Sequence, residues 1–424
     1  MASSGKTVEI MFESVLDTYE KQDQLIDKTT FMEPDPSKSQ NSGNVVWRPT
    51  QQHAPVISGW DLTGQETDII EETYPSILGT PSNDFVQQRA DDLRDPQFWK
   101  RRGEQSGMRQ ASELNKAIAN AIAIQGSKFI RSNTGSGYSF IAEAQALLNE
   151  TQQYQSERCF VLNDRDTLTY SDDLAARQTV QGRPADTWAS GQIGANVAGF
   201  NVYTGSYLPN LVGGAAISTT VTGNQSFVPE GGTVDQATGI VTNVDYRSAT
   251  IPVAASASYN VGDKVEIHNT AVAVQSLGLS DKNSTGQPMT FTIVAKPTAT
   301  SITVYPKPIA LDDGALNTIE AAYANINTQI LNGATVERVN TDATNKTNLF
   351  FDKSAIEVVG GTIPAELFKQ YDGMKVVSSK MANGLTLYMV YDGNIATMNF
   401  RYRIFTWYGI TVANPQNCGV AVSY

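Results

Sequence analysis

The chain is poor in the residues on which secreted, membrane and metal-binding proteins depend. Its 424 residues include only two cysteines, Cys159 and Cys418. Two cysteines are too few for a disulfide framework in a chain of this length, so we expect folding in a reducing compartment, with both thiols buried as small hydrophobic groups.

The longest apolar runs, such as 117–124, fall far short of the roughly 20 residues of a membrane span. Residues 1–10 contain Lys6 and Glu9 and lack an apolar signal core, so we expect no secretion signal.

Groups that carry out catalysis are equally scarce. The two histidines, His53 and His268, lie in different predicted domains, and neither has a cysteine or carboxylate at a metal-ligand spacing. The sequence SSGKT at 3–7 resembles the end of a phosphate-binding loop, but it lacks the first glycine and no strand precedes it. Paired acids such as Asp312 and Asp313 are better explained as surface carboxylates than as cation ligands. We therefore predict no enzyme activity and no catalytic, cofactor-binding or metal site.

The charge balance argues against a dedicated nucleic-acid binder. The net charge is −12, whereas a nucleic-acid backbone is usually met by clustered lysine and arginine. A container for nucleic acid remains compatible with this charge, because its inner wall should not grip the polymer. With 40% hydrophobic and 17% charged residues, the chain is globular and long enough for two to three domains.

The N-terminal quarter combines a helix with an extended hairpin. Residues 7–22 predict an amphipathic helix, because Val8, Phe12, Val15 and Tyr19 recur at three- and four-residue spacing. After a polar stretch at 33–43, residues 44–50 and 67–74 are predicted to form the two strands of a long projecting hairpin. Prolines at 49 and 55 exclude a central position in a sheet.

A long helix follows the hairpin. Asp95 and Pro96 form a helix start, in which the carboxylate caps free amides and the proline occupies the first turn. One apolar stripe then continues to Gly126, which predicts about 30 helical residues. A second helix is predicted over 140–154.

The composition changes at about residue 219. Threonine, valine, glycine and asparagine dominate until about 344, with strand-length segments at 264–267, 290–294 and 301–305, which predicts a compact β-barrel or sandwich. After it, an antiparallel sheet is predicted, with a turn at Asp392 and Gly393 and strands at 355–359, 374–377, 385–391 and 397–412. The chain is therefore predicted to be an α+β body interrupted by an all-β insertion.

Several short motifs resemble one known family. Residues 59–63 (GWDLT), 83–85 (NDF) and 89–95 (RADDLRD) are similar to segments in the coat proteins of Salmonella-type short-tailed lambdoid bacteriophages. Further similar segments occur at 222–227 (TGNQSF), 306–313 (PKPIALDD), 322–328 (AYANINT), 373–375 (GMK) and 407–409 (WYG). The resemblance covers about residues 5 to 422, and it is weakest in the N-terminal helix and at 230–244.

The resemblance implies the tailed-phage and herpesvirus major capsid fold, also called the Johnson fold, with an inserted telokin-like β-barrel domain. It also implies a division into named segments: an N-arm (1–43), an E-loop hairpin (44–80), a peripheral domain with the long spine helix (81–137), an axial domain (138–218 and, with the C-terminal sheet, 346–424) and the inserted domain (219–345). We expect the inserted domain to fold when it is expressed alone.

The function implied is that of a major capsid protein. Copies would form hexamers and pentamers in an icosahedral procapsid, built with a scaffolding protein and with a portal protein at one vertex. The shell would then mature around double-stranded DNA without sequence-specific binding. The resemblance places the protein in the virion capsid after assembly in the host cytoplasm, with no cofactor and no membrane.

Three groups of charged residues are predicted to contact partners. The acidic face of the N-terminal helix is predicted to receive a basic scaffolding segment, although a solvated face explains it equally well; its members are Glu9, Glu13, Asp17 and Glu20. The alternating charges after the hairpin are predicted to reach across a subunit boundary, with pairing inside one chain as the alternative; they are Arg89, Asp91, Asp92 and Arg94. In the inserted domain, the predicted contact residues are Asp235, Asp245 and Arg247, for which ordinary surface charge is the alternative.

Two other classes of protein fit parts of the sequence. The Thr- and Asn-rich β segment would also suit another self-assembling phage tail or surface-layer protein, but the long helix and the expected lack of a secretion signal count against a surface layer. A cytosolic hydrolase or nucleotide-binding enzyme would need a constellation of reactive residues that the sequence does not offer.

Overall fold

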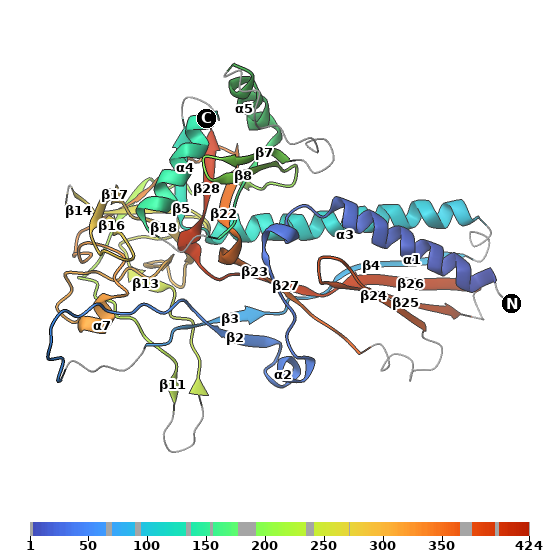
Figure 1. Ribbon diagram of the computed structural model, residues 1–424, viewed down its shortest axis with the longest axis horizontal. Coiled ribbons are helices and arrows are strands. Elements are labelled where there is room, and N and C mark those ends of the chain that lie inside the picture. The colour runs from blue at the N-terminus through green and yellow to red at the C-terminus, as the bar shows by residue number, and fades with distance from the viewer. Residues whose placement is uncertain are drawn as a thin grey trace. The chain divides into compact units, whose positions relative to one another are not determined.

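The computed structural model describes residues 3–64, 70–89, 95–132, 137–152, 156–176, 192–234, 241–270, 272–364, 375–394 and 398–423. Its contacts divide the chain into two units. The first contains Met1–Val46, Ser76–Ala119 and Ile356–Thr411, and the second contains Trp47–Pro75, Asn120–Ala355 and Val412–Tyr424. The long helices all lie before residue 177 of the described chain, and most strand pairs are antiparallel, which confirms the α+β class (Figure 1).

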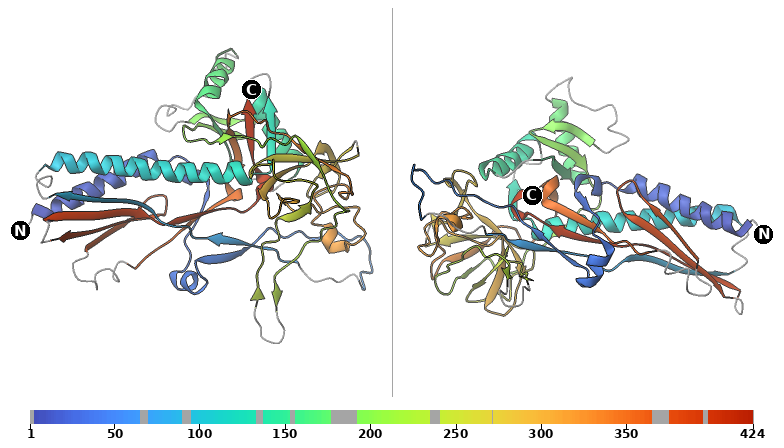
Figure 2. Two further views of the ribbon diagram at one scale, coloured as in Figure 1. Left: turned by 180° about the vertical axis from the view of Figure 1, so that it is seen from behind. Right: turned by 60° about the horizontal axis from the view of Figure 1, so that its bottom comes forward.

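In the first unit, helix α1 (Ser3–Gln22) runs alongside the beginning of helix α3 (Pro96–Gln125) (Figures 1 and 2). The predicted apolar stripe of α1 is buried, as expected for an amphipathic helix. Glycines in α3 let the two helices approach through their backbones. A Cβ atom on Gly103 would lie 2.7 Å from the Met11 carbonyl oxygen, and one on Gly107 would lie 2.5 Å from that of Val15. This contact therefore tolerates no side chain at either glycine.

Helix α3 confirms the prediction made from its start signal and its apolar stripe. The Gln97 amide donates a hydrogen bond to the Asp95 carboxylate at 2.9 Å, so Asp95 caps the helix. The helix contains 30 residues. Near its start, the Trp99 ring makes edge contacts with Phe400 and Tyr402, with ring centroids 5.7 and 5.8 Å apart. The first turns of α3 thus pack on one face of a sheet.

That sheet is antiparallel and has four strands, in the order β24 (Lys375–Lys380), β25 (Thr386–Asn394), β26 (Asn399–Thr406) and β4 (Ser82–Arg89). The turn predicted at Asp392 and Gly393 is wrong. Both residues lie inside β25, where they pair with Arg401 and Phe400. The Arg401 guanidinium lies 3.3 Å from the Asp392 carboxylate and forms an ion pair across the two strands. The strand therefore continues through residues that usually form turns.

The C-terminal strands also do not form one sheet, contrary to the prediction. The segment 397–412 is interrupted at Trp407, so β26 ends before β27 (Tyr408–Val412) begins. Strand β23 (Ile356–Gly360) lies between β27 and β1 (Thr30–Met32), and it pairs with β1 in parallel. Residues 346–424 are thereby divided between the two units. The division of the chain into named capsid segments stays a prediction.

The second unit contains a mixed six-stranded sheet in the order β5 (Lys128–Ser132), β28 (Cys418–Ser423), β22 (Asn348–Asp352), β6 (Arg158–Leu162), β8 (Phe200–Thr204) and β7 (Gln192–Val197). Side chains of α4 (Tyr138–Glu150) and α5 (Asp164–Ala176) share its core. Helix α4 ends four residues before the predicted end. Cys159 and Cys418 are both fully buried, as predicted, and burial raises the pKa of Cys418 to about 12.

The predicted β-rich insertion is a closed barrel. Its strand order is β10 (Ser218–Thr220), β20 (Thr335–Arg338), β14 (Lys264–Asn269), β18 (Thr290–Ala295), β19 (Ser301–Tyr305) and β13 (Ala249–Pro252), with β15 (Val272–Ala273) beside β14. Closure comes from two hydrogen bonds of 2.9 Å, from the Thr222 amide to the Pro252 carbonyl and from the Ala254 amide to the Thr220 carbonyl. Its buried core draws only on residues between Val221 and Val336. Independent folding of this segment stays a prediction.

The predicted hairpin is formed by β2 (Val45–Pro49) and β3 (Thr73–Ile77). Of the predicted second strand, residues 67–69 lie outside the described residues and 70–72 are not in a strand. The remaining short elements are η1 (Ile26–Lys28), α2 (Pro36–Asn41), β9 (Asn210–Leu211), β11 (Thr233–Val234), β12 (Val241–Thr242), β16 (Gln275–Leu277), β17 (Ser284–Pro288), α7 (Thr318–Ala321), β21 (Asn345–Lys346), η3 (Lys353–Ala355) and η4 (Pro415–Asn417).

A buried lysine of the barrel caps the end of helix α3. The ammonium group of Lys264, on β14, donates hydrogen bonds to the carbonyl oxygens of Ala123 and Gly126 and to the Thr292 hydroxyl. Carbonyl groups in the last turn of a helix have no partner within the helix and carry partial negative charge, so a cation there is favourable. Burial nevertheless lowers the pKa of Lys264 to about 7. The cap therefore combines strong hydrogen bonds with a costly desolvation.

Replacing Lys264 with methionine tests this cap, because Lys264→Met keeps most of the packing volume and removes every donor. The Ala123 carbonyl then loses its lysine donor, which we expect to lower the free energy of unfolding by about 1–3 kcal/mol. Urea denaturation followed by circular dichroism measures the change. The control is Lys346→Met, at an exposed lysine of the same unit. Equal stability of the two variants would contradict the role given to the cap.

Candidate subunit-contact sites

The arm is defined here as residues 50–64 and 70–74, which comprise the described part of the segment between β2 and β3 and the first two residues of β3. Two of its apolar side chains lie in full contact with solvent. Val56 is 93% exposed, and the Trp60 side chain is fully exposed. A tryptophan buries 150–250 Å² when it packs, so leaving one in water forgoes one of the largest available gains in burial. Exposed apolar groups of this size mark a surface that another molecule covers.

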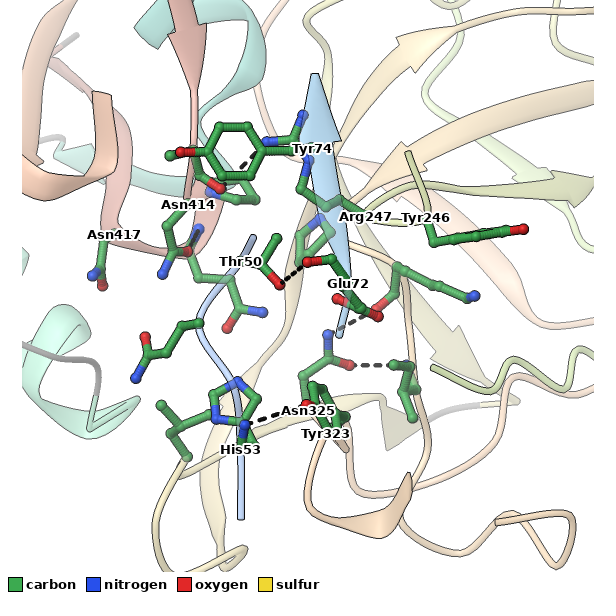
Figure 3. A pocket seen from close by; sticks show the side chains of 18 of the residues that line it. Thr50, His53, Glu72, Tyr74, Tyr246, Arg247, Tyr323, Asn325, Asn414 and Asn417 are labelled. Atoms are coloured by element: carbon green, nitrogen blue, oxygen red, sulfur yellow. Dashed lines mark hydrogen bonds between the residues drawn. The ribbon is translucent and has the colours of Figure 1, made fainter. Parts of the chain in front are cut away.

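The base of the arm is held by one tyrosine of the barrel domain. The Tyr323 hydroxyl donates a hydrogen bond to the Ile70 carbonyl at 2.7 Å and accepts one from the His53 amide at 3.4 Å. The His53 ring also contacts the Tyr323 ring edge to face, with centroids 4.9 Å apart (Figure 3). A single side chain thus binds both the outgoing and the returning part of the arm.

The returning part of the arm is held by a second group, Arg247. Its guanidinium lies over the Tyr74 ring, 4.9 Å from the centroid (Figure 3). It also lies over the Tyr305 ring, 5.3 Å from that centroid. It donates to the Asp245 carboxylate at 2.8 Å and to the Val412 carbonyl at 2.6 Å. Asp245 and Arg247, which were predicted to contact another subunit, are therefore paired with each other inside one chain. Contact with another subunit stays a prediction for both.

A cavity of about 460 Å³ lies beside the arm base (Figure 3). Its walls come from the arm, from the barrel domain and from the segment around η4; the side chains include those of Gln51, Glu72, Tyr246, Lys307, Asn325 and Asn417. Burial raises the pKa of Glu72 to about 7, although the positive charge of Lys307 opposes this shift. Burial also lowers the pKa of His53 to about 4. Burial therefore disfavours the charged form of both groups.

The four predicted scaffold-contact residues all lie exposed on α1. Asp17 forms an ion pair with Lys21 at 2.7 Å, and the Glu20 carboxylate accepts a hydrogen bond from the Ala382 amide at 3.0 Å. Glu9 and Glu13 are the other two. The acidic face is thus real, and half of it already interacts within the chain. Its contact with a scaffolding protein stays a prediction.

The other predicted contacts are described only in part. Arg89 is exposed at the end of β4, paired along the backbone with Asn399. Asp91, Asp92, Arg94 and Asp235 lie outside the described residues. Sequence reasoning missed Tyr323 as an anchor of the arm, because its partners are more than 250 positions away. Trp60 was considered only as part of the motif at 59–63. A tryptophan in a stretch that contains glycine and proline and has no helical or strand periodicity is itself a signal of an interaction site.

Groups for chemistry remain scattered. The His268 Nε2 atom lies 3.7 Å from a carboxylate oxygen of Glu266 and 3.7 Å from one of Glu337. Glu337 is distant in the sequence, so its proximity to His268 was not predicted. Within the described ranges, no three histidine, cysteine or acidic side chains are grouped as ligands for a metal ion. Among the same residues, no helix is long and apolar enough to span a membrane.

A family model settles which proteins this chain is related to. The model described as "P22 coat protein - gene protein 5" matches residues 1–423. The chain belongs to the P22 coat protein family. As a member of this family of structural phage proteins, it is a major capsid protein that forms an icosahedral shell, and it is not an enzyme. The resemblance inferred from the motifs is confirmed.

Solved capsid structures are similar to this P22-family coat protein at low sequence identity. The capsid of cyanophage P-SCSP1u is 10% identical, with 94% of this chain and 86% of that chain covered and a TM-score of 0.44. The mature capsid of bacteriophage PhiM1 is 9% identical, with 93% and 85% covered and a TM-score of 0.41. A virus-like particle from Pyrococcus furiosus is 8% identical, with 97% and 98% covered and a TM-score of 0.40.

The cavity predicts a pH dependence of stability. Because the pKa of Glu72 rises from 4.5 to about 7 on folding, the folded protein keeps a proton that the unfolded chain releases. The resulting stabilisation is complete below pH about 4.5 and is lost as the pH rises through about 7. We expect Glu72→Gln to remove this part of the decline. Unfolding in urea across that pH window measures it, with Glu71→Gln, at an exposed neighbour, as control. Parallel profiles for wild type and Glu72→Gln would contradict the assignment.

Proposed function

We propose that this coat protein assembles as hexamers and pentamers into a procapsid around a scaffolding protein, with a portal protein at one vertex. The shell then matures around packaged double-stranded DNA, and assembly takes place in the host cytoplasm. The observation that carries the proposal is the arm, which presents Val56 and Trp60 to solvent. A second copy of the chain is the partner that a self-assembling coat protein always has at hand.

The gain from covering the arm is large enough to matter. Burying a tryptophan side chain contributes about 4 kcal/mol or more before the costs of association are subtracted. An arm that meets a different surface of the next copy makes a head-to-tail contact. Such contacts close into rings when the rotation between copies permits. The proposed rings of five and six copies are closed arrangements of this kind.

The acidic face of α1 favours a basic scaffolding partner. Its carboxylates attract cationic segments at low salt and lose this attraction as ions screen them. We assign the main contact to Glu9 and Glu13, because Asp17 and Glu20 already bind Lys21 and the Ala382 amide.

The charge of the chain suits the proposed relation to DNA. A protein that binds a nucleic-acid backbone neutralises phosphates with lysine and arginine. This chain has a net charge of −12, so it is proposed to enclose DNA without sequence-specific binding. We expect DNA packaged inside such a shell to slide along the inner surface without being bound tightly to it. The portal contact and the proposed segments, from the N-arm to the inserted domain, follow from the family alone.

Substitution of Trp60 tests the arm. We expect Trp60→Ser to leave the monomer's melting temperature nearly unchanged, because the side chain is exposed, and to reduce the yield of closed shells severely. Sedimentation and electron microscopy of the assembled protein measure the yield. The control is Val272→Ser, which removes an exposed apolar side chain from the barrel domain. A normal shell yield from Trp60→Ser would rule out the arm as the principal subunit contact.

Charge reversal on α1 tests the scaffold contact separately. We expect the double variant Glu9→Lys with Glu13→Lys to remain folded and to lose co-assembly when it is co-expressed with a scaffolding protein. Glu113→Lys, at an exposed glutamate of α3, repeats one reversal away from the acidic face and should assemble normally. Procapsid yield is read by sedimentation, and wild-type co-assembly should weaken with added salt. Normal procapsids from the double variant would exclude this face as the scaffold site.

A further inference from the structure

We infer that the barrel domain is the positioning element of the arm, with Tyr323 and Arg247 setting the direction in which the arm meets a second copy of this chain. The inference rests on the proposed function, because it concerns how the arm is aimed at its partner. Neither side chain needs to touch that partner. Both act through the arm segments they hold, so they are positioning residues.

Tyr323 is well placed to hold the arm because its own position is fixed. It follows α7, whose first turn is closed by a capping box: the Asn317 side chain accepts from the Glu320 amide, and the Glu320 side chain accepts from the Asn317 amide. The Tyr323 amide then donates to the Glu320 carbonyl at 3.0 Å. From this rigid turn, one phenol reaches His53 on one side of the arm and Ile70 on the other. Movement of either segment breaks a hydrogen bond.

Arg247 holds the returning segment in a different way. Its guanidinium is confined by the Asp245 carboxylate and the Val412 carbonyl, so the face presented to the Tyr74 ring has little freedom. A backbone bridge between Thr73 and Asp245 joins the same two segments. A planar guanidinium fixed by several hydrogen bonds is a better stacking surface than a mobile ammonium. The arm strand is therefore tied to the barrel domain beside the point where it becomes β3.

The cavity explains why these few contacts matter. Protein interiors normally fix neighbouring segments by close packing, which leaves no room for rotation. Here about 460 Å³ of space adjoins the arm base, between Glu72, Lys307 and the segment around η4. Packing does not fill that side, so the hydrogen bonds of Tyr323 and the stacking of Arg247 determine the direction of the arm.

The first experiment is made on the unassembled full-length chain. Tyr323→Phe keeps the ring contact with His53 and removes both hydrogen bonds to the arm. We expect amide hydrogen exchange at His53 to rise about tenfold. We also expect the distance distribution between spin labels on Val56→Cys and Val272→Cys to broaden. Both native cysteines are fully buried and stay unlabelled. The matched control is Tyr246→Phe, which removes a hydroxyl group from the same cavity wall.

Arg247→Lys provides a second variant, which keeps the positive charge and loses the planar guanidinium that stacks on Tyr74. It should broaden the same distribution of spin-label distances. The assembly of each variant is then examined by electron microscopy. Broadened distributions together with aberrant shells support the inference, provided that the melting temperature stays close to that of Tyr246→Phe. An unchanged distribution in both variants overturns it, and so do broadened distributions with normal shells. Trp60→Ser separates the two proposals: normal shells from that variant defeat the arm contact itself, whereas aberrant shells leave only the positioning role in question.

Discussion

The hydrogen bonds of the buried Lys264 side chain join the end of α3 to the barrel, and several parts of the second unit meet at this point. This side chain satisfies carbonyl groups at the end of α3 from a strand in the centre of the barrel sheet, and it is fully buried. The same helix end is followed directly by β5, an outer strand of the six-stranded sheet. Helix end, barrel and sheet therefore meet around one buried amino group, and a side chain that supplies only volume leaves the carbonyl groups without this donor.

Contacts within the chain and contacts proposed between chains follow opposite rules. Within the chain, interfaces are tight and specific, as at Gly107, where only a hydrogen atom fits against α1. The surfaces proposed for partners are open and chemically simple: an exposed indole on the arm and a row of carboxylates on α1. A subunit built in this way keeps its own shape while its partners exchange, which is what a shell with several kinds of neighbour requires.

Local signals in the sequence predicted the local structure. Asp95 and the apolar stripe after it located α3 to within a residue or two, and the change in composition at 219 located the barrel. Failures came where distant residues decide. Asp392 and Gly393 have turn propensity, yet pairing with β26 keeps them in a strand. The anchors of the arm could not be predicted, because a tyrosine's hydroxyl group gives no sign in the sequence of which distant backbone it will bind.

The position of β28 has a consequence for the order of folding. This strand, close to the end of the chain, lies between β5 and β22 in the six-stranded sheet, whereas every strand of the barrel comes from one continuous stretch. During synthesis the barrel can close as soon as its last strand, β20, leaves the ribosome. The larger sheet has a gap that only β28 fills. Its completion therefore waits until residues 418–423 have been synthesised, and premature termination anywhere before residue 418 leaves two strand edges open to aggregation.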